Sequence, residues 1–165
     1  MVSKGRAVIM AAFVGLGALM AFFFYYGDSF QPTLQKVDIQ LQTVKVLSVD
    51  KIKNQASLEI DYLLVNPTTV TTTISVIDYE VYANGKDIGA GHYSVEDIPE
   101  AGRPALFPGG NTTVPDTFQL VDSDNISDVY NSIIKGEPVK YEVKGTVTIE
   151  STLTSIQKDF DSFLG

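Results

Sequence analysis

The chain has 165 residues, no cysteine, one histidine and a formal net charge of -8. Lys4 and Arg6 are the only charged residues before position 27, so residues 27–165 hold the other 10 basic residues and all 20 acidic ones. A domain with this excess of acidic residues repels phosphate backbones, which argues against nucleic-acid binding. Because the chain has no cysteine, it also has no disulfide, thiolate metal site or cysteine nucleophile. Residues 27–165 suffice for one domain with a hydrophobic core.

Residues 7–26 form an apolar run without a charged residue. At about 1.5 Å of rise per residue, a helix of this length spans the roughly 30 Å hydrocarbon core of a bilayer. Lys4 and Arg6 precede the run and Asp28 is the first charge after it, so the positive-inside rule places residues 1–6 in the cytoplasm and the domain outside it. We therefore expect an uncleaved single-pass anchor in a cell membrane.

Two other interpretations of this segment are open. A cleaved secretory signal has an apolar run of about 7–15 residues followed by small residues, whereas this run is longer and ends in aromatic residues. Lys4-Gly5 before a long apolar run resembles a prepilin processing site. In that case the run is the assembly helix of a filament, and the mature chain begins at Arg6.

The segment after the apolar run, residues 27–36, is polar and contains Pro32, which predicts a linker. From Val37 onward apolar and polar residues alternate, as in a half-buried strand. The alternation changes phase near Thr43 and Val44, which indicates a β-bulge.

Turn residues divide the next part of the chain into strands. Residues 57–66 alternate up to Asn66-Pro67, where proline removes the donor that a strand ladder needs. A long strand is expected over residues 70–83, with a change of phase near its middle. Asn84-Gly85, a pair favoured in type I′ turns, then leads into a return strand over residues 86–95.

A loop rich in glycine and proline is expected at residues 98–110, followed by a strand over 111–121. Residues 124–135 predict a helix, with Ser123 or Asp124 as its N-cap and a glycine after its end. Two strands, over residues 139–151 and 153–163, complete the domain. The apolar stripe of the helix comprises Ile126, Val129, Tyr130, Ile133 and Ile134.

These elements predict a mainly β fold, an antiparallel β-sandwich of about seven strands over residues 37–165 with one short α-helix, preceded by the transmembrane helix. The composition agrees. Valine, isoleucine and threonine, which suit a pleated surface, supply 41 of the 139 residues after position 26, whereas alanine supplies five.

The stretch LVNPTTVTTTISVIDYEVYANGKDIGAG, residues 64–91, resembles the WHy (water stress and hypersensitive response) domain of group 2 late embryogenesis abundant proteins. The resemblance extends over residues 38–163. It implies a sandwich of fibronectin type III-like shape, a role in desiccation and stress protection, and no catalytic residue. Many small members are soluble, so the N-terminal anchor is a departure. The residues that carry the resemblance are Asn66, Pro67, Ile74, Tyr79, Val81, Asn84, Gly85, Gly91, Tyr141 and Gly145.

Few side chains are candidates for chemistry. His92 lies on a predicted strand, and one histidine without cysteine makes a poor metal-ligand set, so we interpret it as a surface or half-buried strand residue. Asp122, Asp124 and Asp128 offer oxygen ligands for Ca²⁺, but their spacing is not that of an EF-hand loop, and helix capping also accounts for the first two. We expect no cofactor.

Two sequons, Asn111-Thr112-Thr113 and Asn125-Ile126-Ser127, are candidate glycosylation sites. They matter only if the domain lies outside the cytoplasm of a glycosylating organism.

Three classes of function fit these observations. The first is a non-enzymatic, membrane-anchored extracytoplasmic WHy domain that protects membrane or envelope proteins during water loss. The second is a pilin-like or structural subunit of a cell-surface assembly, and the third is an accessory binding module of a membrane complex. The partners implied are the membrane, envelope proteins and further copies of the chain. The scarcity of nucleophiles, metal ligands and acid/base groups argues against an enzyme.

Overall fold

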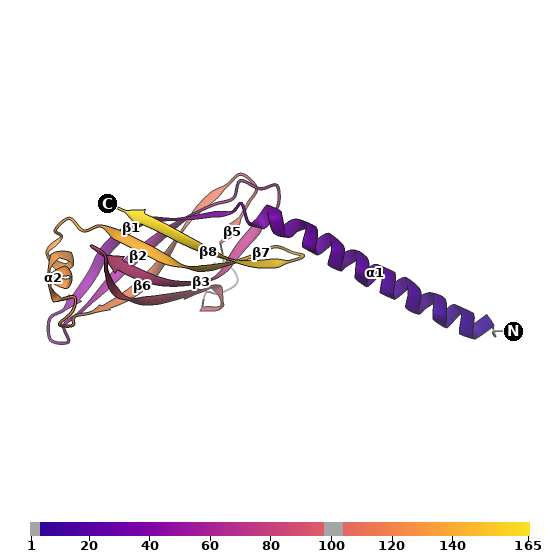
Figure 1. Ribbon diagram of the computed structural model, residues 1–165, viewed down its shortest axis with the longest axis horizontal. Helices are drawn as coiled ribbons and strands as arrows, with labels where there is room; N and C mark the ends of the chain where they lie inside the picture. The colour runs from indigo at the N-terminus through magenta and orange to yellow at the C-terminus, as the bar shows by residue number, and fades with distance from the viewer. Residues whose placement is uncertain (1–3, 98–103) are drawn as a thin grey trace.

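The alternating segments form two antiparallel sheets that pack face to face, which confirms the predicted sandwich. The computed structural model describes residues 4–97 and 104–165. One sheet has the order β1-β2-β6, with β1 at Asp38–Asp50, β2 at Gln55–Val65 and β6 at Asn111–Val121. The other has the order β4-β3-β7-β8 (Figure 1), with β3 at Thr72–Ala83, β4 at Lys86–Ser94, β7 at Tyr141–Glu150 and β8 at Ser155–Leu164. A short β5, Ala105–Leu106, pairs with β3, and a 3₁₀ turn, Val95–Asp97, follows β4.

The core lies between the two sheets, where the inward rows of side chains meet. Every second residue of β2, from Ala56 to Leu64, is buried, and so is the row of β3 from Ile77 to Ala83. Burial of these apolar side chains is the main stabilising contribution to such a fold. The alternation of apolar and polar residues in the sequence therefore corresponds to the buried and exposed faces of each strand.

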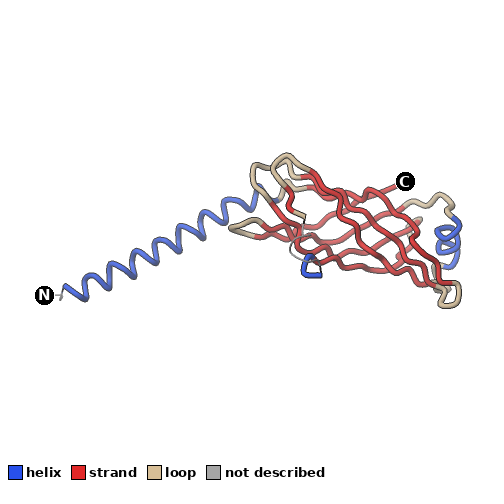
Figure 2. Tube along the Cα trace, turned by 180° about the vertical axis from the view of Figure 1, so that it is seen from behind, coloured by secondary structure: helices blue, strands red, loops and turns tan. Residues whose placement is uncertain are grey.

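Side-chain contacts join the sheets at both of their edges. At one side, the backbone N–H of Leu41 on β1 donates to Ser162 Oγ on β8 at 2.7 Å. At the other side, the Phe118 ring on β6 lies against Gly89 on β4, where a Cβ would be 3.1 Å from the ring. The strands run lengthwise, and α1 and the short helix α2 lie at opposite ends of the sandwich (Figure 2).

Two irregularities predicted from phase changes are present. The register between β1 and β2 shifts between Leu41 and Thr43, which confirms the bulge. The register between β3 and β7 shifts between Ile74 and Val76, where the alternation of β3 changes phase.

The helix α2 spans Ser127–Lys135, so it begins three residues later than predicted. Its N-cap is Ile126, without a side-chain capping bond, which corrects the expectation of Ser123 or Asp124. The physical reason is a backbone turn, in which the Ile126 N–H donates to the Ser123 carbonyl at 3.0 Å and the buried Ile126 side chain fixes the entry to the helix. The apolar stripe faces the core as predicted, and Gly136 ends the helix at φ 71°.

The described residues exclude part of the loop predicted at residues 98–110. They also exclude residues 1–3 of the predicted tail. Within the rest of that loop, β5 is a strand the sequence did not predict. Two residues are too few for a periodic pattern, so its pairing depends on the neighbouring β3 alone.

Candidate functional site

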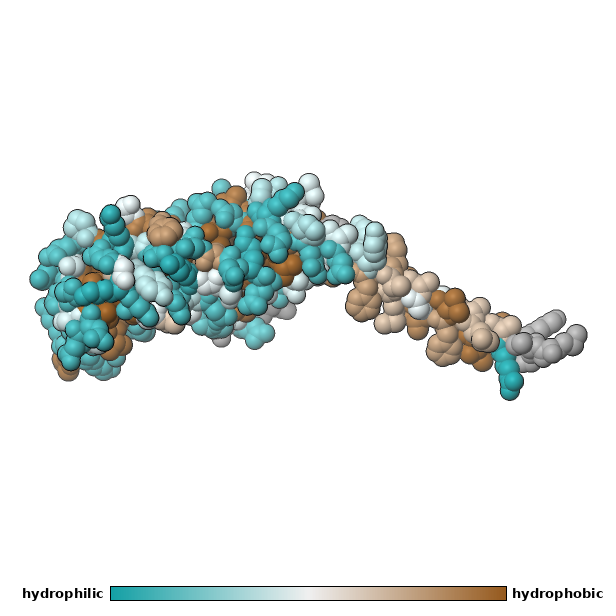
Figure 3. All heavy atoms as spheres, in the orientation of Figure 1, coloured by the Kyte–Doolittle hydropathy of each residue, from teal (hydrophilic) through white to brown (hydrophobic). Residues whose placement is uncertain are grey.

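The most distinctive surface of the molecule is the helix α1, Lys4–Leu34, which projects from one end of the sandwich (Figure 1). It is the one helix in the described part of the chain that is long and apolar enough to cross a membrane. Its large apolar side chains are exposed, with Phe13 at 70% and Phe24 at 73%. In Figure 3 this apolar helix contrasts with the mostly polar surface of the sandwich. A continuous apolar surface of this size needs an apolar environment.

The segment expected to be a linker, residues 27–36, is instead helical up to Leu34. The reason is tertiary contact. Leu34 and Val37 are buried in the core of the sandwich, and Lys158 Nζ on β8 donates to the carbonyls of Gln35 at 3.2 Å and Val37 at 2.7 Å. These two carbonyl groups follow the end of α1, so the lysine joins the chain between α1 and β1 to β8. The domain is therefore fused to α1 rather than tethered to it.

Asn66, the first residue of the recognised motif, connects the β2–β3 loop to strand β5 and to the loop before β6 at the α1 end of the sandwich. Its side chain is fully buried, and Nδ2 donates to the carbonyls of Val70 at 2.8 Å and Leu106 at 2.9 Å. Its Oδ1 accepts from the Thr68 N–H at 3.0 Å, and its carbonyl accepts from the Gly109 N–H at 2.8 Å. Pro67 is exposed and directs the chain out of β2. The Asn-Pro pair thus has a structural role.

Three further motif residues form one packing unit across β4, β3 and β7. The Tyr79 ring lies over Gly91, where any Cβ would overlap the ring, and a Cβ at Gly145 would overlap the Asp78 carbonyl. Both glycines are directly opposite Tyr79 in the strand register. The two glycines are needed because the ring and the backbone occupy the space of their side chains.

Asn84, Gly85 and Tyr141 of the motif are at the other end of the sandwich. Asn84 and Gly85 have φ values of 51° and 78°, as a type I′ turn requires, so this turn is confirmed. Asn84 Oδ1 also accepts from the Lys140 N–H at 3.0 Å, which ties the β3–β4 turn to the chain before β7. Tyr141 is half-buried against the core at the start of β7.

A carboxylate–tyrosine cluster lies between the sheets at the β4–β6 side. The half-buried Asp116 points inward from β6 and accepts a hydrogen bond from the Tyr79 hydroxyl at 2.6 Å. Burial raises the pKa of Tyr79, Tyr62 and Tyr93 around it. These phenols stay neutral at physiological pH, so their hydroxyls can donate hydrogen bonds to a carboxylate but do not readily transfer a proton. Sequence patterns did not identify it, because Asp116 comes near Tyr79 only in the folded sandwich.

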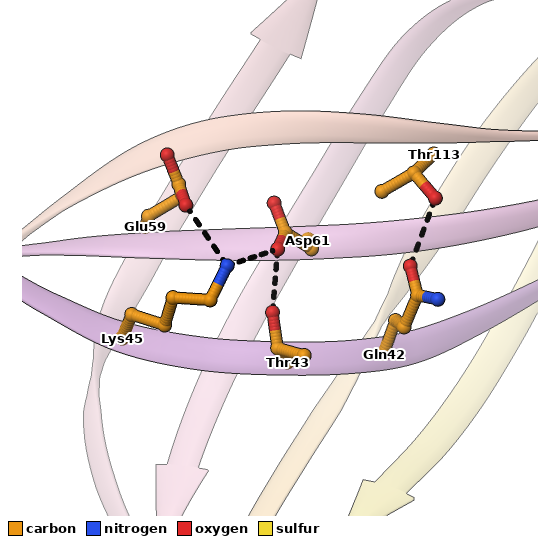
Figure 4. A network of polar contacts seen from close by, with 6 residues as sticks. All are labelled: Gln42, Thr43, Lys45, Glu59, Asp61 and Thr113. Atoms are coloured by element: carbon orange, nitrogen blue, oxygen red, sulfur yellow. Dashed lines mark hydrogen bonds and ion pairs between the residues drawn. The ribbon is translucent and has the colours of Figure 1, made fainter.

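A second polar network lies on the outer face of the β1-β2-β6 sheet (Figure 4). Asp61 Oδ2 accepts from Thr43 Oγ1 at 2.5 Å and from Lys45 Nζ at 3.0 Å, and Lys45 also pairs with Glu59 at 3.3 Å. The Thr43 hydroxyl, followed by Lys45, lowers the pKa of Asp61 despite its burial. The hydrogen bond to Asp61 contributes most to the raised pKa of Lys45. Each of these groups has a partner within the network, which indicates a structural role across β1 and β2.

The outer face of the other sheet carries an open, shallow hollow. Four acidic side chains line it, with Lys144 among them. His92 is exposed beside it, and its Nδ1 lies 2.6 Å from Asp78 Oδ1. The strand position predicted for His92 is correct. The acidic residues of the hollow are Asp78, Glu80, Asp159 and Asp161.

The calcium candidates are near α2, and one of them has another partner. Asp128 pairs with Lys86 Nζ at 2.6 Å, which joins α2 to the β3–β4 turn and lowers the Asp128 pKa. Asp122 is half-buried after β6, and Asp124 is exposed in the turn before α2. Among the described residues, no group of three or more histidine, cysteine, aspartate or glutamate side chains is placed to hold a metal ion.

Both sequon asparagines are exposed. Asn111 begins β6 at the α1 end, whereas Asn125 precedes α2 at the opposite end. Glycosylation of either side chain stays a prediction.

No protein-family model matches the chain, and no curated protein is similar to it in sequence. Solved structures do resemble it. AT1g01470 from Arabidopsis thaliana is 14% identical with a TM-score of 0.51, covering 76% of this chain and 79% of that one. A protein from Archaeoglobus fulgidus is 21% identical with a TM-score of 0.44, covering 76% and 94%. The late embryogenesis abundant (LEA) protein At2g46140.1 is 13% identical with a TM-score of 0.47, covering 98% and 90%.

The likeness to AT1g01470 shows a shared sandwich fold. A shared fold does not by itself establish a shared function, so the functional argument depends on the surfaces described above.

Proposed function

We propose that this chain is a non-enzymatic, single-pass membrane protein that holds an acidic WHy-like domain outside the cytoplasm, where it protects membrane or envelope proteins during water loss. The observation that carries the proposal is α1, an exposed apolar helix that runs directly into the buried Leu34 of the domain. A bilayer supplies the apolar environment that this helix needs.

The distribution of charge supports the orientation. Lys4 and Arg6 precede the apolar run, whereas residues 27–165 carry twice as many acidic as basic residues. Basic residues close to a membrane span favour the cytoplasmic side. The domain is therefore assigned to the opposite side.

The roles of the motif residues support a protective rather than a catalytic function. Asn66, Tyr79, Gly91, Asn84 and Gly85 all serve packing or turn geometry. The acidic groups are mostly exposed and spread over the surface, where they hold water and repel other acidic proteins. We infer that this hydrated surface, displayed close to a membrane, limits contact between neighbouring proteins as water is lost.

Protease accessibility tests the anchor and its orientation. The full chain is expressed in cells, and protease is added to intact and to permeabilised samples. We expect digestion of the domain in intact cells, with a membrane-held fragment containing α1. Protection of the full chain in intact cells and its digestion after permeabilisation would refute the orientation, and release of the chain by an alkaline wash would refute the anchor.

Drying tests the protective role. A desiccation-sensitive reporter enzyme is dried with vesicles that carry the full chain and with vesicles that lack it. We expect more reporter activity after rehydration with the chain present, and equal recovery would refute this part of the proposal.

A further inference from the structure

The turn between β7 and β8, residues 151–154, packs beside α1. Leu153 lines a shallow hollow together with Met20, Phe23 and Phe24 of the helix. Closer to the sandwich, Gly27 is buried, and a Cβ there would be 3.3 Å from the Leu153 carbonyl oxygen. The β7–β8 hairpin accordingly extends along the side of α1 (Figure 1).

This contact fixes the level of Leu153 along the apolar helix. Met20 and Phe24 precede Tyr26, the last residue of the apolar run, by six and two residues. At about 1.5 Å per residue, the hollow that Leu153 lines therefore lies about 3–9 Å below Tyr26 along the axis, whereas the Leu153 carbonyl lies beside Gly27, one residue above Tyr26. The helix before Met20 is too short to span alone, because residues 7–19 cover only about 20 Å of the roughly 30 Å hydrocarbon core. A bilayer that is spanned by α1 must then reach the level of Leu153.

The chemistry of the turn suits lipid. Residues 151–157 carry no charge, and Leu153 is 46% exposed although it touches α1. The polar groups of the turn bond to one another: the Ser151 N–H donates to the Thr154 carbonyl at 2.8 Å, and Ser151 Oγ accepts from the N–H groups of Leu153 at 3.4 Å and Thr154 at 3.3 Å. Internal pairing of this kind is what backbone groups need where water is absent.

We propose that the β7–β8 turn inserts into the outer leaflet beside α1, with Leu153 among the acyl chains and the hydroxyls of Thr152 and Thr154 at the headgroups. The turn is then a second membrane contact, which fixes the tilt and rotation of the domain on the bilayer. This inference rests on the proposed membrane anchor. It adds a lipid-binding element on the sandwich itself.

The absence of cysteine from the chain permits a direct measurement of depth. Three single-cysteine variants of the full chain, Leu153→Cys, Phe13→Cys and Ile52→Cys, are labelled with an environment-sensitive fluorophore. They are reconstituted into phosphatidylcholine vesicles that contain spin-labelled lipid. Phe13 reports on the anchor, and Ile52, which is 95% exposed in the turn between β1 and β2, is the control at the far end.

We expect the fluorescence emission of the label to shift to shorter wavelength and to be quenched by the spin-labelled lipid at positions 153 and 13. We expect neither effect at position 52. Quenching at 13 without quenching at 153 would overturn the insertion and leave the anchor intact. Absence of quenching at 13 would overturn the anchor and this inference together.

A substitution in the turn provides the second test. With the label at Thr152→Cys, adding Leu153→Asp places a charge where the leaflet disfavours it. The emission of the label, which the proposed arrangement places at the headgroups, should shift to longer wavelength, while the thermal melt of the domain stays unchanged because Leu153 is outside the core. An unchanged emission in the Asp variant would contradict the proposal.

Discussion

Replacing Asn66 with alanine tests whether the Asn-Pro motif acts through folding. The buried amide loses its bonds to Val70, Leu106 and Thr68. The Val70 carbonyl keeps the Thr68 hydroxyl as a donor at 3.2 Å, so the Thr68 N–H and the Leu106 carbonyl are the groups most affected. Each buried polar group left unpaired costs about 1–3 kcal/mol, so the free energy of unfolding should fall by about 2–6 kcal/mol. That is a large part of the roughly 5–15 kcal/mol typical of a domain.

Urea unfolding of the full chain in detergent micelles measures this change, with tyrosine near-ultraviolet circular dichroism as the signal because the chain has no tryptophan. Asn125→Ala, at an exposed asparagine, is the matched control and should stay within about 0.5 kcal/mol of the parent chain. An equally small change for Asn66→Ala would refute the structural role of the motif.

Two further predictions concern the hairpin and acid stability. Gly85→Val should lower the melting temperature more than Asn84→Gly, because a β-branched residue is strained at a φ of 78°. The Asn84→Gly variant loses only the hydrogen bond from the Lys140 N–H. Equal melting temperatures for the two variants would contradict this reasoning. The depressed pKa of Asp61, set first by the Thr43 hydroxyl, stabilises the fold above the unfolded pKa, and this contribution disappears as pH falls through the folded value. Acid titration below about pH 4 should therefore weaken the parent chain more than Asp61→Asn, and parallel stability–pH curves would exclude the effect.

The strands could be predicted because burial in a sandwich repeats every two residues. The bulge at Thr43 and the phase change in β3 were visible because each interrupts that repeat. In β8 the same repeat runs inward through Phe160, so Ser162 takes the inward position and Phe163 is 67% exposed, although serine is polar and phenylalanine apolar. Ser162 does so because its hydroxyl accepts the Leu41 N–H of β1, a partner 121 residues away.

Contacts between residues far apart in the sequence also determine where α1 ends and bring together the carboxylate–tyrosine cluster. A polar segment with a proline indicates a linker, but burial of Leu34 and donation from Lys158 extend α1 into the sandwich. The inward Asp116 occupies a regular strand position and gives no local signal of its bond to Tyr79. In each case the deciding contact joins residues far apart in the sequence.

The fusion of α1 to the sandwich has an electrostatic consequence in the proposed arrangement. β1 has 13 residues, so at about 3.3 Å per residue the far end of the sandwich, with Asp128 and α2, is about 40 Å from the end that carries α1. This distance is about five times the roughly 8 Å Debye length at physiological ionic strength. Charges at the far end therefore contribute little repulsion against an anionic bilayer, and the turns next to α1 decide whether the domain can rest on it. At that end, residues 66–77, 104–115 and 151–157 carry no charged residue, whereas the turn Val95–Asp97 after β4 carries Glu96 and Asp97.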